Sequence, residues 1–458
     1  MNHPSIASLV VLAGAVAAWG GCATAPNDVR QVSTGLEQRS GHSVSNGPPG
    51  EVAWPITVTP ADGLSEDELV TLALWNNAAF QESLADLGLS RADLVQAGML
   101  PNPTLSMLFP VGAKPFELTA RYPLEILWLR PKRVTAARLD YERTAQRLVQ
   151  SGLDLIRDVR VAFADVALAN QRLQLAQATV TLNQQIADQA DARFRSGEAS
   201  ELEAGNARVD VLQAREQLAR ARHEARVGNE RLRSLAGLSF AQWPGLQDST
   251  APSGFAGDAG LLLTNALHAR PDLRAAEIGL EAAGKRIGLA RAETFTLAAG
   301  INGKDVGSGA KEEFLVGPAL ELAVPILNQN QGGVSQARAR FEKAARQYFT
   351  VRDRIALDVR EAHARLVQAQ ESVDQWRQQI LPPLEESVKR AETAYAAGNV
   401  TYLFVLENSR KLSDARAKAA AATADVRRAR AELERAIGAR LEVGADSNRS
   451  ASAHYEIQ

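Results

Sequence analysis

The stretches "ARFRSGEASEL" (residues 192–202) and "TAYAAGNVTYL" (residues 393–403) decide the fold, because they place the same signals 201 positions apart. Each has an aromatic residue, then a glycine three positions later, then a hydroxyl side chain after three more. The first lies in a segment without proline that runs from Lys132 to Trp243. We therefore predict that each stretch is a tight turn between two long helices.

The residues of the first turn have definite expected roles. Gly197 tolerates the positive φ that caps the C-terminus of a helix. Ser200 suits the N-cap of the returning helix, with Glu203 three positions on as its capping-box partner. Gly398 and Thr401 are predicted to make the same turn in the second stretch.

The whole chain of 458 residues repeats in this way. Two further pairs of segments align at nearly the same spacing, residues 73–98 with 266–291 and residues 132–142 with 332–342. Self-similarity at a fixed spacing indicates duplicated architecture. We predict two copies of one structural unit, at residues 63–252 and 253–441.

Each copy contains a segment in which apolar and polar residues alternate, as in β-hairpins. The predicted strands lie at about 103–123 and 293–324. Their apolar positions are Leu105, Met107, Phe109, Val111, Phe116, Leu118, Ala120, Tyr122, Phe295, Leu297, Ala299, Ile301, Phe314, Val316, Leu320 and Leu322. Strands of about 9 to 11 residues have the length that crosses a bilayer at a tilt.

Two interpretations of these strands are open. An amphipathic four-stranded sheet could cover helices in a soluble protein. In a membrane, four strands cannot close a barrel, so closure around a conducting pore requires at least three chains that contribute twelve strands. The small and polar residues would then face water inside.

Long helical regions are predicted at about 133–236 and 333–438. From Leu148 to Val180, apolar or small residues recur with 4-3-4-3 spacing, which is typical of a coiled coil. A second apolar face predicts neighbours on two sides, as in a ring of helices. The sequence "ILPPL" (residues 380–384) must kink or interrupt the helix of the second copy.

The N-terminal residues 1–21 have the form of a signal peptide, with an apolar stretch that ends in small residues. "GGC" at residues 20–22 resembles a lipobox, which implies acylation of Cys22; ordinary cleavage nearby is the alternative. Residues 22–62, rich in Ser, Gly and Pro, are expected to form an extended linker. Residues 442–458 are expected to be a flexible tail.

Composition excludes several classes of function. A net charge of −2 gives no indication of nucleic-acid binding. One cysteine and six scattered histidines predict no metal site and no cofactor. Acidic residues occur without a nucleophile arrangement, so we predict that the protein is not an enzyme.

The order of these features resembles the TolC outer-membrane efflux family, with the overall character of its CzcC-like heavy-metal branch. The resemblance rests on the duplicated unit, on "AGMLPNP" from Ala97, on "GPALELAVPILNQNQGGVSQARA" from Gly317, and on the two turns. It implies a mainly α fold with a small β part, and a homotrimer whose twelve-stranded outer-membrane β-barrel continues as a twelve-helix periplasmic α-barrel. It also implies a periplasmic adaptor and an inner-membrane pump, of the RND type in that branch.

By position, the resemblance makes the two turns a periplasmic entrance. Gly197, Ser200, Gly398 and Thr401 would lie where adaptor tips dock. Glu203 and Glu407 match acidic entrance residues, and Tyr395 matches a tyrosine of the closing network. Val400 and Phe404 stand where the family has a basic and an acidic residue, so its salt-bridge lock is not expected here.

Three copies each of Glu203 and Glu407 would make this entrance negative, with Phe404 narrowing it. Such crowding would raise some carboxylate pKa values and favour block by divalent cations. The alternatives are a helix-capping Glu203, a solvated Glu407 and a Tyr395 that packs the turn.

The sequence thus leaves three functions open. The first is a passive exit duct for efflux, and the second is the exit duct of a type I protein-secretion system. The third is a periplasmic coiled-coil scaffold tethered by Cys22. The cargo could be metal ions, small organic compounds or protein.

Overall fold

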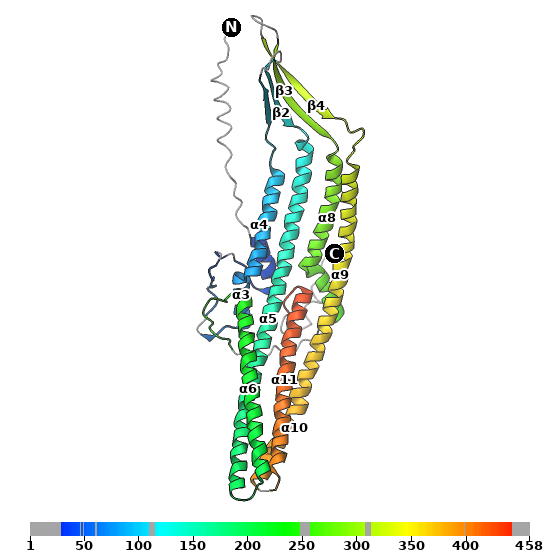
Figure 1. Ribbon diagram of the computed structural model, residues 1–458. Coiled ribbons are helices and arrows are strands. Elements are labelled where there is room, and N and C mark those ends of the chain that lie inside the picture. Colours follow the sequence, from blue (N-terminus) through cyan, green and yellow to red (C-terminus); the bar gives the residue numbers. More distant parts are fainter. Residues whose placement is uncertain are drawn as a thin grey trace.

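The computed structural model of the protein is elongated, with a small sheet at one end and two helical turns at the other (Figure 1). It describes residues 29–45, 47–48, 50–59, 62–109, 115–247, 257–306, 313–397 and 399–441. The predicted signal peptide, Cys22, Gly398 and the predicted tail lie outside the described residues.

Four helices form one layer beneath the sheet. In spatial order they are α4 (Ala78–Gly98), the upper part of α5 (Ile126–Arg195), α8 (Pro271–Ala292) and α9 (Gln331–Asp374). Each contacts its neighbours in this order, so α4 and α9 are the two edges of the layer. The expected mainly helical fold with a small sheet is confirmed.

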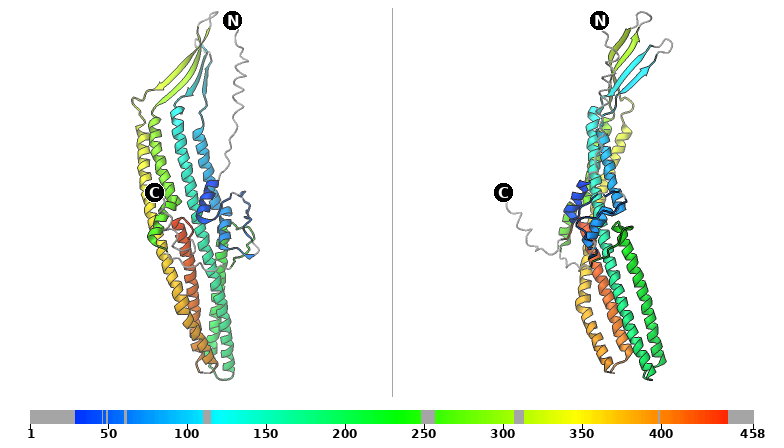
Figure 2. Two further views of the ribbon diagram at one scale, coloured as in Figure 1. Left: turned by 180° about the vertical axis from the view of Figure 1, so that it is seen from behind. Right: turned by 90° about the vertical axis from the view of Figure 1, so that its left-hand side faces the viewer.

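The lower half is a second helix layer. It consists of α6 (Glu201–Leu235), the lower part of α5, α11 (Tyr402–Ile437), and then the lower part of α9 with α10 (Leu381–Ala396), in that spatial order. The α5–α6 and α10–α11 turns lie together at the lower end (Figure 2).

Shorter helices pack against the middle of the molecule. They are α2 (Arg30–Ser40), α3 (Glu66–Asn76) and α7 (Ala259–Ala269). Ser65 and Glu68 form a capping box that starts α3.

The expectation of an extended linker is wrong for residues 30–40, which form α2. Val32 and Leu36 are fully buried in the main core. Leu36 packs directly over Gly152 of α5, where an added Cβ would lie 2.6 Å from its side chain. Tertiary burial therefore stabilises a helix that local composition does not indicate.

The two prolines of "ILPPL" act as expected, but the interruption is small. A π-helical turn, Gln375–Ile380, lies between α9 and α10, and both prolines fall in the first turn of α10. A proline there removes no hydrogen bond that the helix start would otherwise make, so the wider π turn accommodates the break.

The sheet contains β1 (Thr104–Leu108), β2 (Glu117–Pro123), β3 (Thr296–Val306) and β4 (Glu313–Ala323), all within the segments where alternation predicts strands. They pair antiparallel in the order β1-β2-β3-β4. The β2–β3 pair joins the two copies of the repeat, and β1 and β4 are open edges.

Candidate functional site

The register of the sheet gathers apolar side chains on one face. Leu105 pairs with Ala120, which pairs in turn with Ile301, so these side chains point the same way. Seven large side chains of this face are between 43% and 71% exposed, and they are Leu105, Met107, Ile301, Phe314, Val316, Leu320 and Leu322. The sheet extends beyond the helices of the described residues (Figure 2), so none of those helices covers this face.

The opposite face of the sheet carries cross-strand ion pairs among more polar and small side chains, although Leu108 and Leu315 also lie on it. Lys304 Nζ lies 2.9 Å from Glu117 Oε1, and Arg121 Nη1 lies 2.8 Å from Glu321 Oε2. One face thus suits a hydrocarbon environment and the other suits water.

The α5–α6 turn is built largely as the sequence predicts. Gly197 has φ +79°, and the Glu198 amide donates to the Arg193 carbonyl at 2.8 Å. Ser200 Oγ accepts the Glu203 amide at 3.2 Å. The capping box is only half formed, because the hydrogen bonds of the described residues include no return bond from the Glu203 carboxylate.

The α10–α11 turn differs from the prediction in its cap. Thr401 occupies the N-cap position of α11 with extended backbone, but its side chain makes no capping hydrogen bond. The Asn399 amide donates to the Ala394 carbonyl at 2.9 Å and closes the turn. The expected capping role of the Thr401 hydroxyl is therefore wrong.

Tyr395 contacts a basic residue that sequence reasoning missed. Arg193 Nη1, at the end of α5, donates to Tyr395 Oη at 3.3 Å, and its guanidinium lies 5.9 Å from the ring centroid. Beside this contact, Ile186 of α5 packs against Leu406 of α11. A basic side chain thus contacts Tyr395, but it comes from α5 in the first repeat and not from position 400.

A second missed contact also joins the two helical hairpins. Arg410 Nη2 of α11 lies 2.5 Å from Asp210 Oδ1 of α6. Thr179 and Ser413 form a hydrogen bond at 3.3 Å between α5 and α11. Together with Arg193 and Tyr395, these side chains hold the lower ends of the hairpins against each other.

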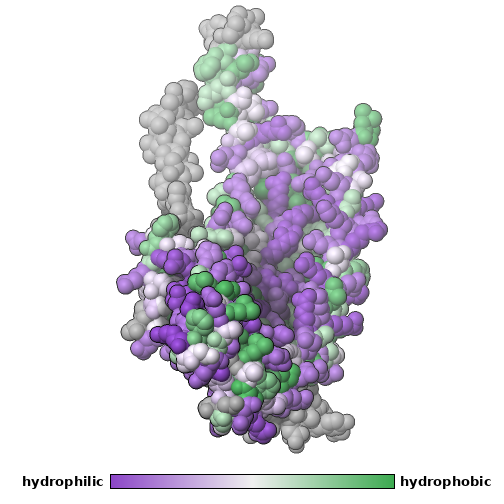
Figure 3. All heavy atoms as spheres, turned by 60° about the horizontal axis from the view of Figure 1, so that its bottom comes forward, coloured by the Kyte–Doolittle hydropathy of each residue, from purple (hydrophilic) through white to green (hydrophobic). Residues whose placement is uncertain are grey.

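The predicted entrance residues are accessible at this end of the molecule. Phe404 is 48% exposed, and Glu407 is exposed. Lys411 Nζ lies 2.7 Å from Glu407 Oε1 and lowers the pKa of that carboxyl, so within one copy its charge is partly compensated. Glu203 is half-buried and raises the pKa of Arg193, after the larger effect of Tyr395. Figure 3 shows hydrophobic side chains among hydrophilic ones at the helix-tip end.

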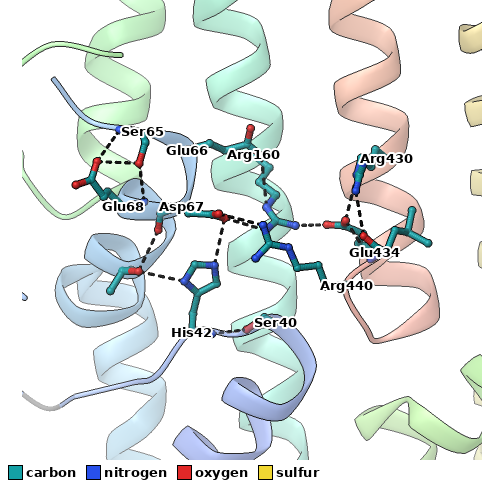
Figure 4. Close-up of polar contacts among 12 residues, drawn as sticks. Ser40, His42, Ser65, Glu66, Asp67, Glu68, Arg160, Arg430, Glu434 and Arg440 are labelled. Atoms are coloured by element: carbon teal, nitrogen blue, oxygen red, sulfur yellow. Dashed lines mark hydrogen bonds and ion pairs between the residues drawn. The ribbon is translucent and has the colours of Figure 1, made fainter. Parts of the chain in front are cut away.

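A buried ion-pair cluster in the middle of the molecule was not predicted at all (Figure 4). Arg160 of α5, with 9% of its side chain exposed, contacts Glu434 of α11. The same guanidinium lies 3.4 Å from both Glu66 and Asp67 at the start of α3. Arg440, just after α11, lies 3.0 Å from Asp67. The cluster ties the first copy to the end of the second.

The two carboxyl groups at the start of α3 differ in electrostatic environment. The pKa of Asp67 is far below its usual range, first because of its contact with His42 and then because of Arg440 and Arg160. Burial raises the pKa of Glu66, against the opposing effect of Arg160. Asp67 therefore stabilises the fold when it is ionised, whereas ionised Glu66 carries a desolvation cost.

Two further features bear on the function. Within the described ranges, no cluster of three His, Cys, Asp or Glu residues has the arrangement to hold a metal ion. Among the helices of the described chain, none is both long enough and apolar enough to cross a bilayer.

The sequence matches the family described as "Outer membrane efflux protein" over residues 69–238 and 262–439. The chain is 25% identical to the cobalt-zinc-cadmium resistance protein CzcC of Cupriavidus metallidurans, with 85% of this chain and 92% of the relative covered. It is 27% identical to the cation efflux system protein CusC of Escherichia coli K12, with 64% and 66% covered.

Solved structures show the same fold. A crystal structure of CusC superposes with a TM-score of 0.68 at 21% identity and covers 86% of this chain and 98% of that one. The open state of the Neisseria gonorrhoeae MtrE outer membrane channel superposes with a TM-score of 0.65 at 18% identity, with 85% and 94% covered.

We predict that Asp67→Asn lowers the stability of the protein at pH 7 and flattens its acid dependence. A carboxyl with a depressed folded pKa contributes stability above its unfolded pKa near 4, and this contribution is lost as pH falls through the folded pKa. Because the carboxylate is half-exposed, we expect about 1–2 kcal/mol. Thermal unfolding of the purified protein between about pH 2.5 and pH 7 measures the effect.

Glu66→Gln is the matched control, because the pKa of Glu66 is raised whereas that of the neighbouring Asp67 is lowered. Stability from a group with a raised folded pKa is lost as pH rises, so a neutral amide should cost little at pH 7. Equal losses in both variants would contradict an ionic role for Asp67.

Proposed function

Because the chain belongs to the outer membrane efflux protein family, we propose that it is the exit duct of a tripartite efflux system in the outer membrane. An inner-membrane pump and a periplasmic adaptor would deliver the substrate, which then passes through the duct without further chemistry. The family consists of outer-membrane efflux channels, so the protein is not an enzyme. The proposal rests on the sheet, which has an apolar face and an opposite face with ion pairs and extends beyond the described helices.

A homotrimer is the assembly that this sheet supports. β1 and β4 are open edges, and unpaired backbone groups in hydrocarbon cost several kcal/mol each. Three copies, joined edge to edge, would close a twelve-stranded barrel with the apolar face toward lipid and the polar face toward the pore. The helix layers would then continue as a twelve-helix tunnel in the periplasm.

The N-terminus would add a second attachment to the membrane. We propose that residues 1–21 are removed as a signal peptide and that Cys22 is acylated. This part of the proposal rests on the lipobox-like "GGC" alone.

The lower turns are the proposed entrance, where an adaptor would dock around Gly197, Ser200, Gly398 and Thr401. The Asp210–Arg410 and Arg193–Tyr395 contacts would hold it narrow, because each joins the α5–α6 hairpin to the α10–α11 hairpin. Opening would require the hairpins to separate at this end.

The proposed cargo is metal cations, exported with a pump of the RND type. The resemblance to a cobalt-zinc-cadmium resistance protein, which covers 85% of this chain at 25% identity, supports metal cations over the protein cargo of a type I secretion system. Glu203 and Glu407, three copies of each, would make the entrance attractive to cations.

The duct and the tethered scaffold differ in what the apolar face of the sheet contacts. We predict that Leu320→Arg, on the apolar face, abolishes assembly in the outer membrane, since an arginine there costs about 2–4 kcal/mol at the bilayer midplane. Ala319→Arg, on the polar face of the same strand, is the matched control and should still assemble. Carbonate-resistant membrane fractions and heat-modifiable trimer bands measure assembly.

Release of the unmodified protein by carbonate, or equal behaviour of the two arginine variants, would favour the scaffold instead.

The hairpin contacts predict how the entrance is held closed. Asp210→Asn and Arg410→Gln should each raise the open probability of single channels roughly two- to fivefold, because a half-exposed ion pair contributes little more than about 1 kcal/mol. The double variant should add nothing further. Glu385→Gln is the control, since its partner Arg416 lies 2.9 Å away within the α10–α11 hairpin. If Asp210→Asn and Arg410→Gln leave the open probability as unchanged as Glu385→Gln does, the ion pair does not hold the entrance closed.

The acidic residues of the entrance predict ion selectivity. Glu203→Gln and Glu407→Gln should each weaken cation selectivity and block by divalent cations in single-channel recordings. Glu216→Gln, in the middle of α6, should leave both unchanged. Selectivity and block that stay the same in both entrance variants would rule out the negative entrance.

A further inference from the structure

The α4 edge of the upper helix layer carries an exposed stripe with the spacing of a helix-packing seam. Leu89, at its centre, is 67% exposed. The other exposed members recur at intervals of three and four residues, and they are Ala78, Glu82, Ala85, Ala92 and Gln96. Small residues with one large apolar side chain at this spacing are typical of a surface that packs on another helix. Asp86 and Asp93 flank the stripe and are also exposed.

The α9 edge, on the other side of the layer, has a matching exposed stripe, and most of the charged residues on this edge are basic. Phe349, 51% exposed, belongs to it. Its other exposed members include Ser335, Ala339, Glu342, Arg346 and Asp353. Arg338, Arg340 and Lys343 lie on the same exposed stretch of helix. One edge is therefore acidic and the other predominantly basic.

The joint between the two copies within the chain shows how such edges meet. There, α8 packs on α5: Ile278 and Ala282 bury Leu139, and Arg286 forms an ion pair with Asp140. Arg143 also approaches α8 closely. An added Cβ at Gly279 would lie 3.3 Å from its Cδ.

The duplication relates this joint to the two free edges. The alignment of residues 132–142 with 332–342, continued along the helix, makes α9 the counterpart of α5. The alignment of residues 73–98 with 266–291 makes α4 the counterpart of α8. A joint between α9 of one copy and α4 of the next would therefore repeat the α5–α8 joint.

The counterparts are complementary, with their charges exchanged. Arg340 stands in the place of Asp140, and Asp93 stands in the place of Arg286. The ion pair is thus kept with its signs reversed. At the next contact, Lys343 replaces Arg143 and Asp86 replaces Gly279, which would create a new pair.

The apolar contact is exchanged in the same way. Leu139 packs against Ala282 in the internal joint, and their counterparts are Ala339 and Leu89. The large side chain thus moves from one helix to the other. Within the described part of the chain, Asp86, Asp93, Arg340 and Lys343 have no ion-pair partner.

We propose that α9 of one copy docks against α4 of a second copy of this chain in the geometry of the α5–α8 joint, with Arg340 opposite Asp93 and Lys343 opposite Asp86. The inference rests on the proposed trimer and specifies its contact surface. The open strands β4 and β1 lie above the same two edges, so the two joints would be continuous.

A disulfide tests the position of this contact. Leu89→Cys with Ala339→Cys should give covalent dimers and trimers on non-reducing gels after mild oxidation in outer-membrane fractions, because the two sites lie on opposite edges of one copy. Leu89→Cys with Leu357→Cys is the control, since Leu357 is exposed on the same helix but roughly 27 Å further along it. The control should give no ladder.

Exchange of the charges tests the ion pair. Asp93→Arg and Arg340→Asp, each alone, should lower the trimer fraction in mild detergent by about tenfold, because like charges then face each other at three joints. The double variant should recover to within about twofold of the parent. Arg138→Asp, on a 73% exposed side chain of α5, controls for charge reversal itself.

The results separate this inference from the proposed function. A trimer that forms but shows no ladder from the Leu89 and Ala339 pair, or no recovery in the double variant, overturns the contact and leaves the duct intact. A parent protein that stays monomeric in the membrane overturns both.

Discussion

The open edges of two stacked layers constrain this protein more than any contact within it. β1 and β4 each leave a row of backbone groups unpaired, which hydrocarbon does not tolerate. The helix layer beneath the sheet ends on the same two sides, at α4 and α9. The proposed edge-to-edge association would satisfy both layers at once. In that assembly the order of the elements would determine which surface faces lipid, which faces water and which faces a neighbouring copy.

Duplication explains how one chain supplies surfaces that fit each other. The internal joint, made by β2 with β3 and by α5 with α8, lies entirely within a single copy. Its residues show what a stable joint of this shape requires. If the outer edges are counterparts of the same two surfaces, as the alignment predicts, they would keep the shape, while the exchange of charge between Asp140 and Arg340 would make the proposed outer joint distinct from the inner one.

Local patterns predicted the elements, but not the contacts between distant segments. The alternation of apolar and polar residues predicted the strands, and Gly197 predicted the α5–α6 turn. Both features depend on backbone geometry that neighbouring residues determine. Arg193 and Tyr395 meet only after two hairpins fold side by side, so no local signal pairs them. The helix α2 was mistaken for a linker because its stability comes from Leu36 packing over Gly152.

The distribution of ion pairs supports the proposed opening at the lower end of the molecule. Arg160 and Glu434 are almost completely buried, and removal of one partner from such a pair leaves an uncompensated charge that costs about 3–5 kcal/mol. The Asp210–Arg410 pair has one side chain 54% exposed, and exposed pairs contribute about 1 kcal/mol or less. Breaking the ion pairs in the middle of the molecule therefore requires more free energy than breaking the pair near the turns. The proposed opening of the duct at its lower end would require this difference.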